Sequence, residues 1–253
     1  MNKKNNKISG WAGFPKIYAN SINFQNINEL SQKIKSDQKL IARGNGRSYG
    51  DSSLADYYIS SLTRDRFLNF DNSNGLLRCE AGVLLYEILD IFVPKGWFLN
   101  VAPGTKMITI GGAVASDIHG KNHHKYGCFS ESINQIKILL ANGQIEYCSK
   151  SLNRELFLAT CGGMGLTGII LEVSFYLKKI KSSKIDMMTI KTQNLKETFN
   201  EFEKNHNKEY SVAWIDCYAK GKSLGRSIIS SGGFPSEGGL NYKPKRKIRI
   251  PSF

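Results

Sequence analysis

The sequence predicts an α+β fold in two domains, with a boundary near residue 180. Along the 253 residues, segments with apolar side chains at helical spacing alternate with short segments in which apolar and polar residues alternate as in a strand. A lysine-rich segment, Lys178–Lys184, then separates this part from a shorter pattern of strands around one helix. With 41% hydrophobic and 22% charged residues, the chain has the composition of a globular protein of one large or two ordinary domains.

The first predicted elements lie before residue 100. Apolar residues at helical spacing predict a short helix over 27–34, and Lys39–Ala42 follows as a brief strand. The turn-like residues 71–75 precede a predicted strand, Leu76–Glu80. A helix over 84–92 comes next and ends before Pro94.

A hairpin is the clearest prediction in the middle of the chain. Strands Ile133–Ala141 and Gln144–Cys148 flank Asn142-Gly143, a strong turn signal. A short helix, Arg154–Thr160, leads into a glycine cluster. From Ile169 to Leu177 the odd positions are apolar and most of the others are polar, which predicts a half-buried strand.

The second domain begins as an α+β unit. We expect strands Ile185–Thr192, Ser211–Ala219 and Arg226–Ser231, and a helix over 195–202 behind Asn194 as its cap. Residues 232–253 are rich in Gly, Pro and Lys and add no further element. One helix on three strands leaves apolar faces without partners, so we expect that the chain stops partway through this domain.

The charge narrows the choice of partners. A formal charge of +14 favours an anionic partner, and nucleic acid, phosphorylated lipid and a diphosphate cofactor all fit that sign. No zinc-finger, RRM or basic-zipper motif occurs, and the basic residues are spread out except in Lys243–Arg249, so nucleic acid is not the expected partner. We expect Lys243–Arg249 to be a solvated, mobile end, with contact to lipid headgroups or phosphate as the alternative.

Cysteine usage and hydropathy predict a cytoplasmic protein. The five cysteines are odd in number, widely spaced and never in a CxxC pair, which indicates reduced thiols. The N-terminus lacks the apolar core of a signal peptide, and no apolar stretch reaches the roughly 20 residues of a membrane span. Association with the membrane surface stays open.

A glycine-rich loop follows the strand that ends at residue 42. Three glycines within Arg43–Asp51 let backbone amides point at an anion, and Arg43, Arg47 and Ser48 add donors that an ordinary glycine turn, the alternative, does not need. The loop is not a dinucleotide fingerprint, because its third glycine comes one position late and no helical pattern follows. No P-loop sequence occurs either.

The stretch Pro103–Gly127 holds the densest run of small residues and three of the four histidines. A run from Met107 to Ile110 leads into Gly111-Gly112, where a flat or phosphorylated group could approach the backbone. His119 is either a structural histidine or, beside Lys121, a group that exchanges protons near neutral pH. Adjacent His123 and His124 with no nearby Glu make a metal site unexpected.

The glycine cluster Gly162–Gly168 completes three such segments, spread over more than half of the first domain. We interpret them as three loops that converge on one long ligand with a diphosphate in its middle, which FAD fits better than a mononucleotide. No GxSxG motif occurs, and no cysteine is marked as a nucleophile.

Three motifs, in this order and spacing, carry a resemblance. ARGNGRSYGDSSL (42–54), PGTKMITIGGAVASDIHGKNHHKYGCF (103–129) and ELFLATCGGMGLTGIILEVSF (155–175) resemble the FAD-linked oxidases of the vanillyl-alcohol-oxidase (PCMH) superfamily, closest to their polyprenylphosphoryl-ribose oxidase branch. SVAWIDCYAKGKSLGRSII (211–229) and KPKRKIRIP (243–251) resemble the substrate domain of that branch. The resemblance implies a PCMH-type FAD-binding domain of two α/β subdomains over residues 1–180 and an incomplete α+β substrate domain over 181–253.

The resemblance also implies site residues. Those that grip the FAD pyrophosphate would be Arg43, Gly44, Asn45, Gly46, Arg47, Ser48, Tyr49, Gly104 and Thr105. Those that line the flavin would be Thr109, Gly111, Gly112, Ser116, His119, Gly120 and Asn122, with Gly165, Gly168 and Ile169 at the adenosine end. Tyr49, His119 and Lys121 would lie nearest the reacting sugar.

The implied chemistry is oxidation of a secondary alcohol of a sugar, with a base that takes the hydroxyl proton. A phosphorylated sugar-lipid or a polyol would be the substrate, and a separate reductase would act on the keto product. A non-catalytic flavin-binding fragment and an alditol or aldonolactone oxidase are the alternatives. Arg47 stands where many superfamily members tether the flavin through a histidine, so FAD is expected to be non-covalent. Relatives continue beyond Phe253 and supply further active-site residues there.

Overall fold

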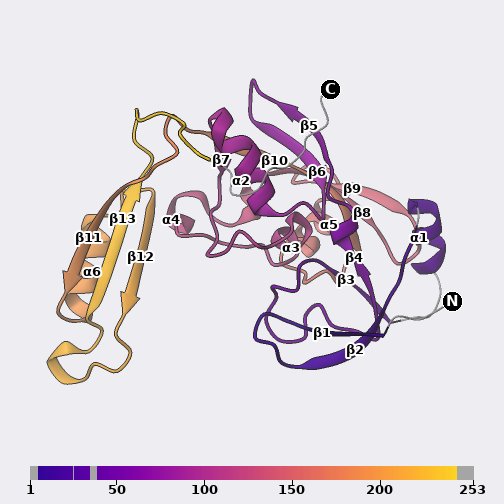
Figure 1. Cartoon of the computed structure of the whole chain (residues 1–253), viewed down its shortest axis with the longest axis horizontal. Coiled ribbons are helices and arrows are strands. Elements are labelled where there is room, and N and C mark those ends of the chain that lie inside the picture. Colours follow the sequence, from indigo (N-terminus) through magenta and orange to yellow (C-terminus); the bar gives the residue numbers. More distant parts are fainter. Residues whose placement is uncertain (1–4, 25, 35–38, 244–253) are drawn as a thin grey trace. The chain divides into compact units, whose positions relative to one another are not determined.

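The computed structural model describes residues 5–24, 26–34 and 39–243, which form two compact units (Figure 1). The first unit holds the described residues up to 89, together with 105–118 and 128–177. The second holds 90–104, 119–127 and the described residues from 178 onward. The functional division at residue 180 stays a prediction. Residues 244–249 of the predicted basic end lie outside the described ranges.

The first unit contains a sheet in the order β1-β2-β4-β3. β1 (Asn5–Ser9) and β2 (Lys16–Ser21) are antiparallel, whereas β4 (Tyr57–Ser60) runs parallel to β2 and to β3 (Leu40–Arg43). Helix α1 (Ile27–Ile34) lies where its apolar spacing predicts it. Its Leu30 is fully buried and packs in one apolar cluster with residues of β4 and of β10 (Ile169–Lys179), which joins this sheet to the next.

A second sheet of the same unit has the antiparallel order β5-β6-β10-β8-β9. Its strands are β5 (Phe67–Asp71), β6 (Leu76–Glu80), β8 (Ile133–Leu139), β9 (Ile145–Cys148) and β10 (Ile169–Lys179). The predicted hairpin is confirmed: β8 pairs with β9, and Gly143 between them has a φ of 82°. Glycine adopts this conformation without strain, which lets the chain reverse in a tight turn.

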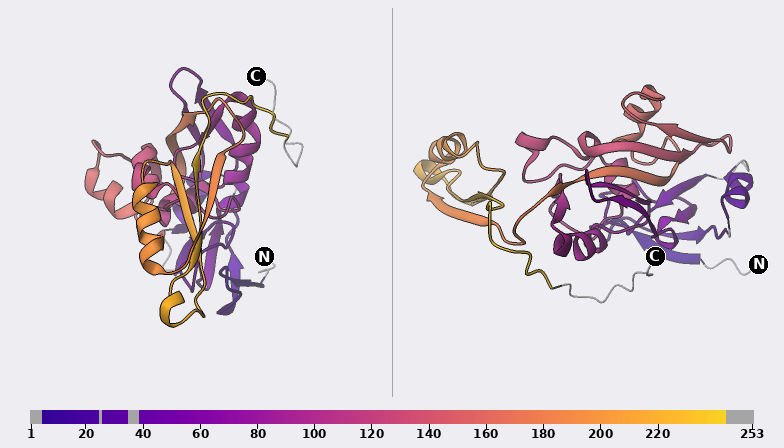
Figure 2. Two further views of the ribbon diagram at one scale, coloured as in Figure 1. Left: turned by 90° about the vertical axis from the view of Figure 1, so that its left-hand side faces the viewer. Right: turned by 90° about the horizontal axis from the view of Figure 1, so that it is seen from above.

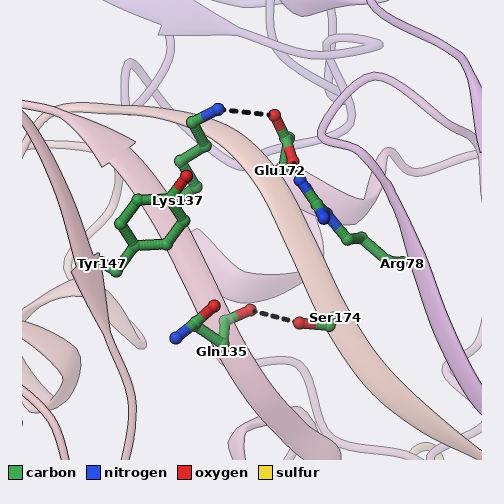
Figure 3. A pocket seen from close by; sticks show the side chains of 6 residues that line it. All are labelled: Arg78, Gln135, Lys137, Tyr147, Glu172 and Ser174. Atoms are coloured by element: carbon green, nitrogen blue, oxygen red, sulfur yellow. Dashed lines mark hydrogen bonds and ion pairs between the residues drawn. The ribbon is translucent and has the colours of Figure 1, made fainter. Parts of the chain in front are cut away.

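The prediction of a half-buried β10 is only partly right. Its odd positions from 169 to 177 are buried as predicted, but Glu172 on the other face is only 9% exposed. Figure 3 shows the reason: Arg78 and Lys137, from the neighbouring strands, reach the Glu172 carboxylate at 2.5 and 2.9 Å and cover it. Alternation in sequence distinguishes the two faces of a strand but not whether ionic neighbours bury the polar one.

Helices α2 (Leu85–Phe92) and α5 (Arg154–Thr160) confirm their predictions. Another prediction is wrong: Gly111 and Gly112 were expected in a loop, but they lie in helix α3 (Ile110–Ala115). Thr109 is its N-cap: the Thr109 Oγ1 accepts a hydrogen bond from the Gly112 amide at 3.1 Å. A cap of this kind offsets part of the low helix propensity of glycine. Short 3-10 turns cover Ser61–Thr63, Val93–Lys95, Phe129–Ser132 and Gly221–Ser223.

The second unit contains β7 (Trp97–Leu99), α4 (His123–Tyr126) and an antiparallel sheet in the order β11-β13-β12, with α6 (Leu195–Lys204) on one face (Figure 2). Asn194 caps α6 as predicted, its Oδ1 accepting from the Glu197 amide at 3.0 Å. β11 (Asp186–Thr192), β12 (Tyr210–Ile215) and β13 (Ser227–Gly233) confirm the three predicted strands. β12 ends at Ile215 rather than Ala219, because the Asp216 carboxylate accepts from two following amides and turns the chain.

One face of this sheet carries exposed apolar side chains. Thr192 Oγ1 lies 2.7 Å from Thr198 Oγ1 of α6, which directs residue 192 and its register neighbours toward the helix. Trp214 of β12 alternates with them and therefore points away from α6, where it is 78% exposed. Over the described ranges, every helix is too short or too polar to cross a membrane.

Candidate functional site

Helix α3 is where two of the predicted glycine-rich segments meet in the first unit. A Cβ added at Gly44 would lie 2.4 Å from Thr109 Oγ1, so the loop 43–50 passes directly against the helix cap. The side chain of Asn45 also donates to the Met107 carbonyl at 2.8 Å. Only glycine permits the first of these contacts, and the two together hold the loop beside the N-terminal end of α3.

The third glycine-rich segment lies at the other end of α3. The amides of Gly162 and Met164 donate to the carbonyls of Val114 and Ala115 at 3.0 and 2.8 Å. Gly168 has a φ of 152°, and a Cβ there would lie 2.5 Å from the Leu139 carbonyl oxygen. The three segments are thus brought together around one short helix, as the interpretation of a single long ligand requires.

The backbone amides of loop 43–50 are available to a ligand. Within the described part of the chain, no amide of residues 44–49 donates a hydrogen bond to another protein group. The loop is partly buried apart from the side chains of Arg47 and Tyr49 and from Gly50. Successive amides without protein acceptors form a concave donor surface of the kind that binds phosphate.

The two arginines of this loop differ in their surroundings. The Arg43 guanidinium donates to the Ser9 carbonyl at 2.7 Å and to the Ser53 hydroxyl at 2.9 Å, and burial lowers its pKa. Arg43 therefore shapes the loop from within. Arg47 is exposed, and its guanidinium carbon lies 5.3 Å from the centre of the Trp11 ring. Such a stacked cation keeps its donors free for an anion.

The space around the glycines of α3 and of the third segment shows whether a flat cofactor fits beside this helix. A Cβ at Gly112 would meet only Thr109 Oγ1, at 3.1 Å, and one at Gly165 would meet nothing within 4 Å. Gly111, one position earlier on the helix, is different, because a Cβ there would press against Ala81 at 3.0 Å. Gly112 thus faces open space while Gly111 faces protein. Together with the unpaired amides, this open space fits FAD, which combines a flat ring with a diphosphate.

The segment 119–122 belongs to the second unit. His119 and Lys121 are exposed, and the His119 ring lies edge-on to His123 with 5.9 Å between centroids. A Cβ at Gly120 would lie 2.5 Å from the Ala102 carbonyl oxygen, so this glycine is needed for packing. Asn122 is fully buried: its amide nitrogen donates to the Asn100 carbonyl at 2.6 Å, while its Oδ1 has no partner among the described residues.

Chain connectivity relates this segment to α3. The Ile118 amide donates to the Ala113 carbonyl at 3.1 Å, and the Ile118 carbonyl accepts from the Phe129 amide at 2.9 Å. Ile118 is therefore fixed just after α3. Because neighbouring Cα atoms are only about 3.8 Å apart, the chain itself holds His119 next to that position.

The predicted site residues therefore fall into two sets. The first unit brings together the members from loop 43–49, the α3 region and the third glycine segment: Arg43, Gly44, Asn45, Gly46, Arg47, Ser48, Tyr49, Thr105, Thr109, Gly111, Gly112, Ser116, Gly165, Gly168 and Ile169. The second unit holds the others: Gly104, His119, Gly120, Lys121 and Asn122.

The N-terminal segment contacts this loop, which the sequence did not predict. The Trp11 amide donates to the Ser48 carbonyl at 2.8 Å, and a Cβ at Gly10 would lie 2.7 Å from the same oxygen. Residues 10 and 11 thus pack directly against loop 43–50. In the sequence, Gly10-Trp11 is the one feature that could have indicated this contact, but nothing in its position relative to residues 43–50 links the two segments.

Two buried carboxylates on the second sheet form ionic clusters rather than a ligand site. Glu172 pairs with Arg78 and Lys137, and the hollow between them, about 10 Å³ in volume, has room for about one water molecule (Figure 3). Burial alone would raise the pKa of Glu172, but the hydrogen bonds from Lys137 and Arg78 outweigh it and lower the pKa below its usual value. Glu80, next to it in register, is held in the same way by Arg64 and Arg66.

Comparison with known proteins agrees with this geometry. Residues 25–149 match the family described as an FAD binding domain. A decaprenylphosphoryl-beta-D-ribose oxidase of Mycolicibacterium smegmatis is 37% identical over 76% of this chain and 43% of its own length. A putative D-arabinono-1,4-lactone oxidase of Neurospora crassa is 29% identical over 65% and 31%, and an L-gulonolactone oxidase of Bos taurus is 27% identical over 66% and 39%. The chain spans less than half the length of these relatives.

Proposed function

Because the chain belongs to the FAD-linked oxidases of the vanillyl-alcohol-oxidase superfamily, whose cofactor is FAD, we propose that it oxidises a secondary alcohol of a sugar. The observation that supports this most strongly is the meeting of three glycine-rich segments around α3, with unpaired amides in loop 44–49 and open space at Gly112. The amides, with Arg47 and Ser48, would hold the pyrophosphate. The open face of α3 would lie against the ring.

FAD is proposed to be bound without a covalent link. Arg47 occupies the position at which many superfamily members carry the tethering histidine, and a guanidinium does not form that bond. Its place over the Trp11 ring instead suits a cation that neutralises phosphate charge. Asn122 Oδ1, buried and without a partner, would accept a hydrogen bond from a donor of the cofactor.

His119 and Lys121 are proposed as the residues that handle the substrate proton and charge. Bound FAD supplies the acceptor for the hydride that leaves the alcohol carbon. The exposed imidazole of His119 would take the hydroxyl proton, because an imidazole exchanges protons near neutral pH. The Lys121 ammonium would stabilise the negative charge that develops on the oxygen, and Tyr49, which is 77% exposed, would contact the sugar.

The relatives suggest which class of substrate to propose. They include oxidases of a polyprenylphosphoryl ribose and of two sugar lactones, so the 2′-hydroxyl of a polyprenyl-phosphoribose is proposed first and an aldonolactone or alditol second. The charge of +14 favours the phosphorylated substrate. A separate reductase that consumes the keto product, and association with the membrane surface, belong to the same proposal.

Titration with FAD followed by anaerobic addition of substrate tests this function. We expect a flavin absorption spectrum that bleaches with a phosphoribosyl lipid and less with L-gulono-1,4-lactone. Stronger bleaching by the lactone would reassign the substrate. Flavin that binds but is reduced by neither compound, with turnover restored by a separately expressed C-terminal part of a full-length relative, would mean a flavin-binding module. Absence of FAD binding would refute the proposal altogether.

A further inference from the structure

A buried lysine of the second unit is enclosed by aromatic rings. The Nζ of Lys178 lies 4.8 Å from the ring centre of Phe234, 4.9 Å from Tyr210, 5.4 Å from Tyr126 and 5.8 Å from Phe98. Its side chain is 13% exposed. These distances are within the range in which a ring face attracts a cation, and the attraction grows when water is excluded.

Two polar groups complete the surroundings of this ammonium. The Tyr210 hydroxyl accepts a hydrogen bond from Lys178 at 2.8 Å, and the Glu209 carboxylate forms an ion pair with it. Burial lowers the pKa of Lys178 to about 8, and the adjacent carboxylate favours the protonated form. Lys178 therefore carries its charge at neutral pH. The titratable groups that face it are Glu209, Tyr210 and Tyr126.

The rings around Lys178 come from four separate segments of the chain. Phe98 lies on β7, Tyr126 ends α4, Tyr210 begins β12 and Phe234 follows β13. The ammonium contacts all four rings, and Phe234 also meets Phe98 and Tyr210 edge-on, at 5.0 and 6.1 Å between centroids. The Lys178 side chain thus contacts both α4 and the three-stranded sheet of the second unit.

The segment 119–126 depends on this attachment. The Ser211 amide, next to Tyr210, donates to the Lys121 carbonyl at 2.9 Å. The imidazole Nε2 of His124 donates to the Lys208 carbonyl at 2.9 Å, from the loop that precedes β12. The segment that carries His119 and Lys121 is therefore bonded to the start of β12 at two points and to Lys178 through Tyr126.

We infer that Lys178 is a positioning residue for the segment 119–126, which it locks to β12 through Tyr126 on one side and Tyr210 with Glu209 on the other. The inference rests on the proposed function only for its catalytic consequence. Loss of the ammonium frees Tyr126 and Tyr210 together, so the hydrogen bond from Ser211 to Lys121 opens more often. The catalytic consequence is misplacement of His119 and Lys121 while loop 43–50 and α3 keep their structure.

Amide hydrogen exchange of the full chain tests the lock without any catalytic readout. In Lys178→Met, which keeps the length of the side chain but not its charge, we expect exchange in 119–127 and at Ser211 to become about tenfold faster, the size of one lost charged contact. Exchange in β8 should stay as in the wild type. Lys178→Arg, which keeps a cation, should restore most of the protection, and Lys181→Met, an exposed lysine three positions on, should change nothing.

Turnover and FAD affinity are measured independently of hydrogen exchange. If the enzyme turns over, Lys178→Met should lower kcat about tenfold or more with unchanged FAD affinity, and Lys178→Arg should recover it. A wild-type chain that binds no FAD would overturn the proposed function but leave the exchange result valid. Faster exchange confined to β12, or no change in 119–127, would overturn the lock. Should Lys178→Met fail to fold, Tyr126→Leu decides the question, since it loosens 119–127 alone if the lock exists and nothing if it does not.

Discussion

Substitution of Gly112 by alanine should separate folding from cofactor binding. Gly112 lies inside α3, and a Cβ there would meet only Thr109 Oγ1, at 3.1 Å. Removal of a helix-interior glycine stabilises a helix by about 0.5–1 kcal/mol. The tight contact with Thr109 offsets part of this gain, because Thr109 is the N-cap and moves only at the expense of its hydrogen bond. The free energy of unfolding of the cofactor-free protein should therefore change by less than about 1 kcal/mol.

The same methyl group should weaken FAD binding strongly. It fills space that the protein leaves open on the face of α3, and forcing one methylene into a packed interface costs about 1–3 kcal/mol. At about 1.4 kcal/mol per factor of ten, the dissociation constant for FAD should rise by about fivefold to about 150-fold. Gly112→Val, with its larger branched side chain, should abolish binding.

Quenching of flavin fluorescence measures the affinity, and thermal unfolding without FAD measures the stability. Gly111→Ala is the matched control, because a Cβ there lies 3.0 Å from Ala81 Cβ and 3.2 Å from the Ala81 carbonyl oxygen. That variant should lower the stability of the cofactor-free protein instead. Wild-type FAD affinity in Gly112→Ala would refute the assignment of this helix face to the flavin.

Three further outcomes are expected. His119→Ala should lower turnover far more than FAD content, measured as bound flavin per chain; equal loss of both would assign His119 a structural role. Acid precipitation of the holoprotein should release the flavin into the supernatant, whereas a yellow pellet would show a covalent link that Arg47 does not provide. Glu172→Gln should lower the free energy of unfolding by about 1–3 kcal/mol at pH 7. Because the folded pKa of Glu172 is lowered, its contribution is present above its unfolded pKa of about 4.3 and is lost as the pH falls through the folded pKa. The difference between variant and wild type in urea titrations should therefore shrink at low pH; a constant difference would contradict the ionic role.

The sequence predicted best those elements whose own residues decide their structure. Helix α6 carries its Asn194 cap and its apolar stripe within a dozen residues, and the Asn142-Gly143 turn holds β8 and β9 together locally. Strand β1 has neither property: it reads Asn-Asn-Lys-Ile-Ser and exists because β2 pairs with it. Strand propensity depends on such cross-strand neighbours, which a single segment does not show.

The same distinction between local and distant contacts holds for the site. Arg43 stands out in the sequence as a donor for an anion, but its guanidinium is taken up by Ser9, which is 34 positions earlier. Lys178 reads as one of several lysines at a boundary, although four rings from distant segments surround it. In both cases the residue type is visible in the sequence, whereas its partner is a product of the fold.

Glycines serve different purposes in this chain, and the space around the missing side chain, together with the φ angle, distinguishes them. Gly44, Gly120 and Gly168 stand where a Cβ would lie 2.4–2.5 Å from a protein oxygen, so they permit close packing inside the molecule. Gly112 stands where a Cβ would meet only Thr109 Oγ1, so packing of the protein does not require a glycine there. A Cβ at Gly165 would meet nothing within 4 Å, but the φ of 79° at this position favours glycine by itself. A glycine in a helix costs about 0.5–1 kcal/mol relative to alanine. At Gly112 the hydrogen bond to the Thr109 cap offsets only part of that cost, and we propose that a cofactor bound against this face of the helix supplies the rest.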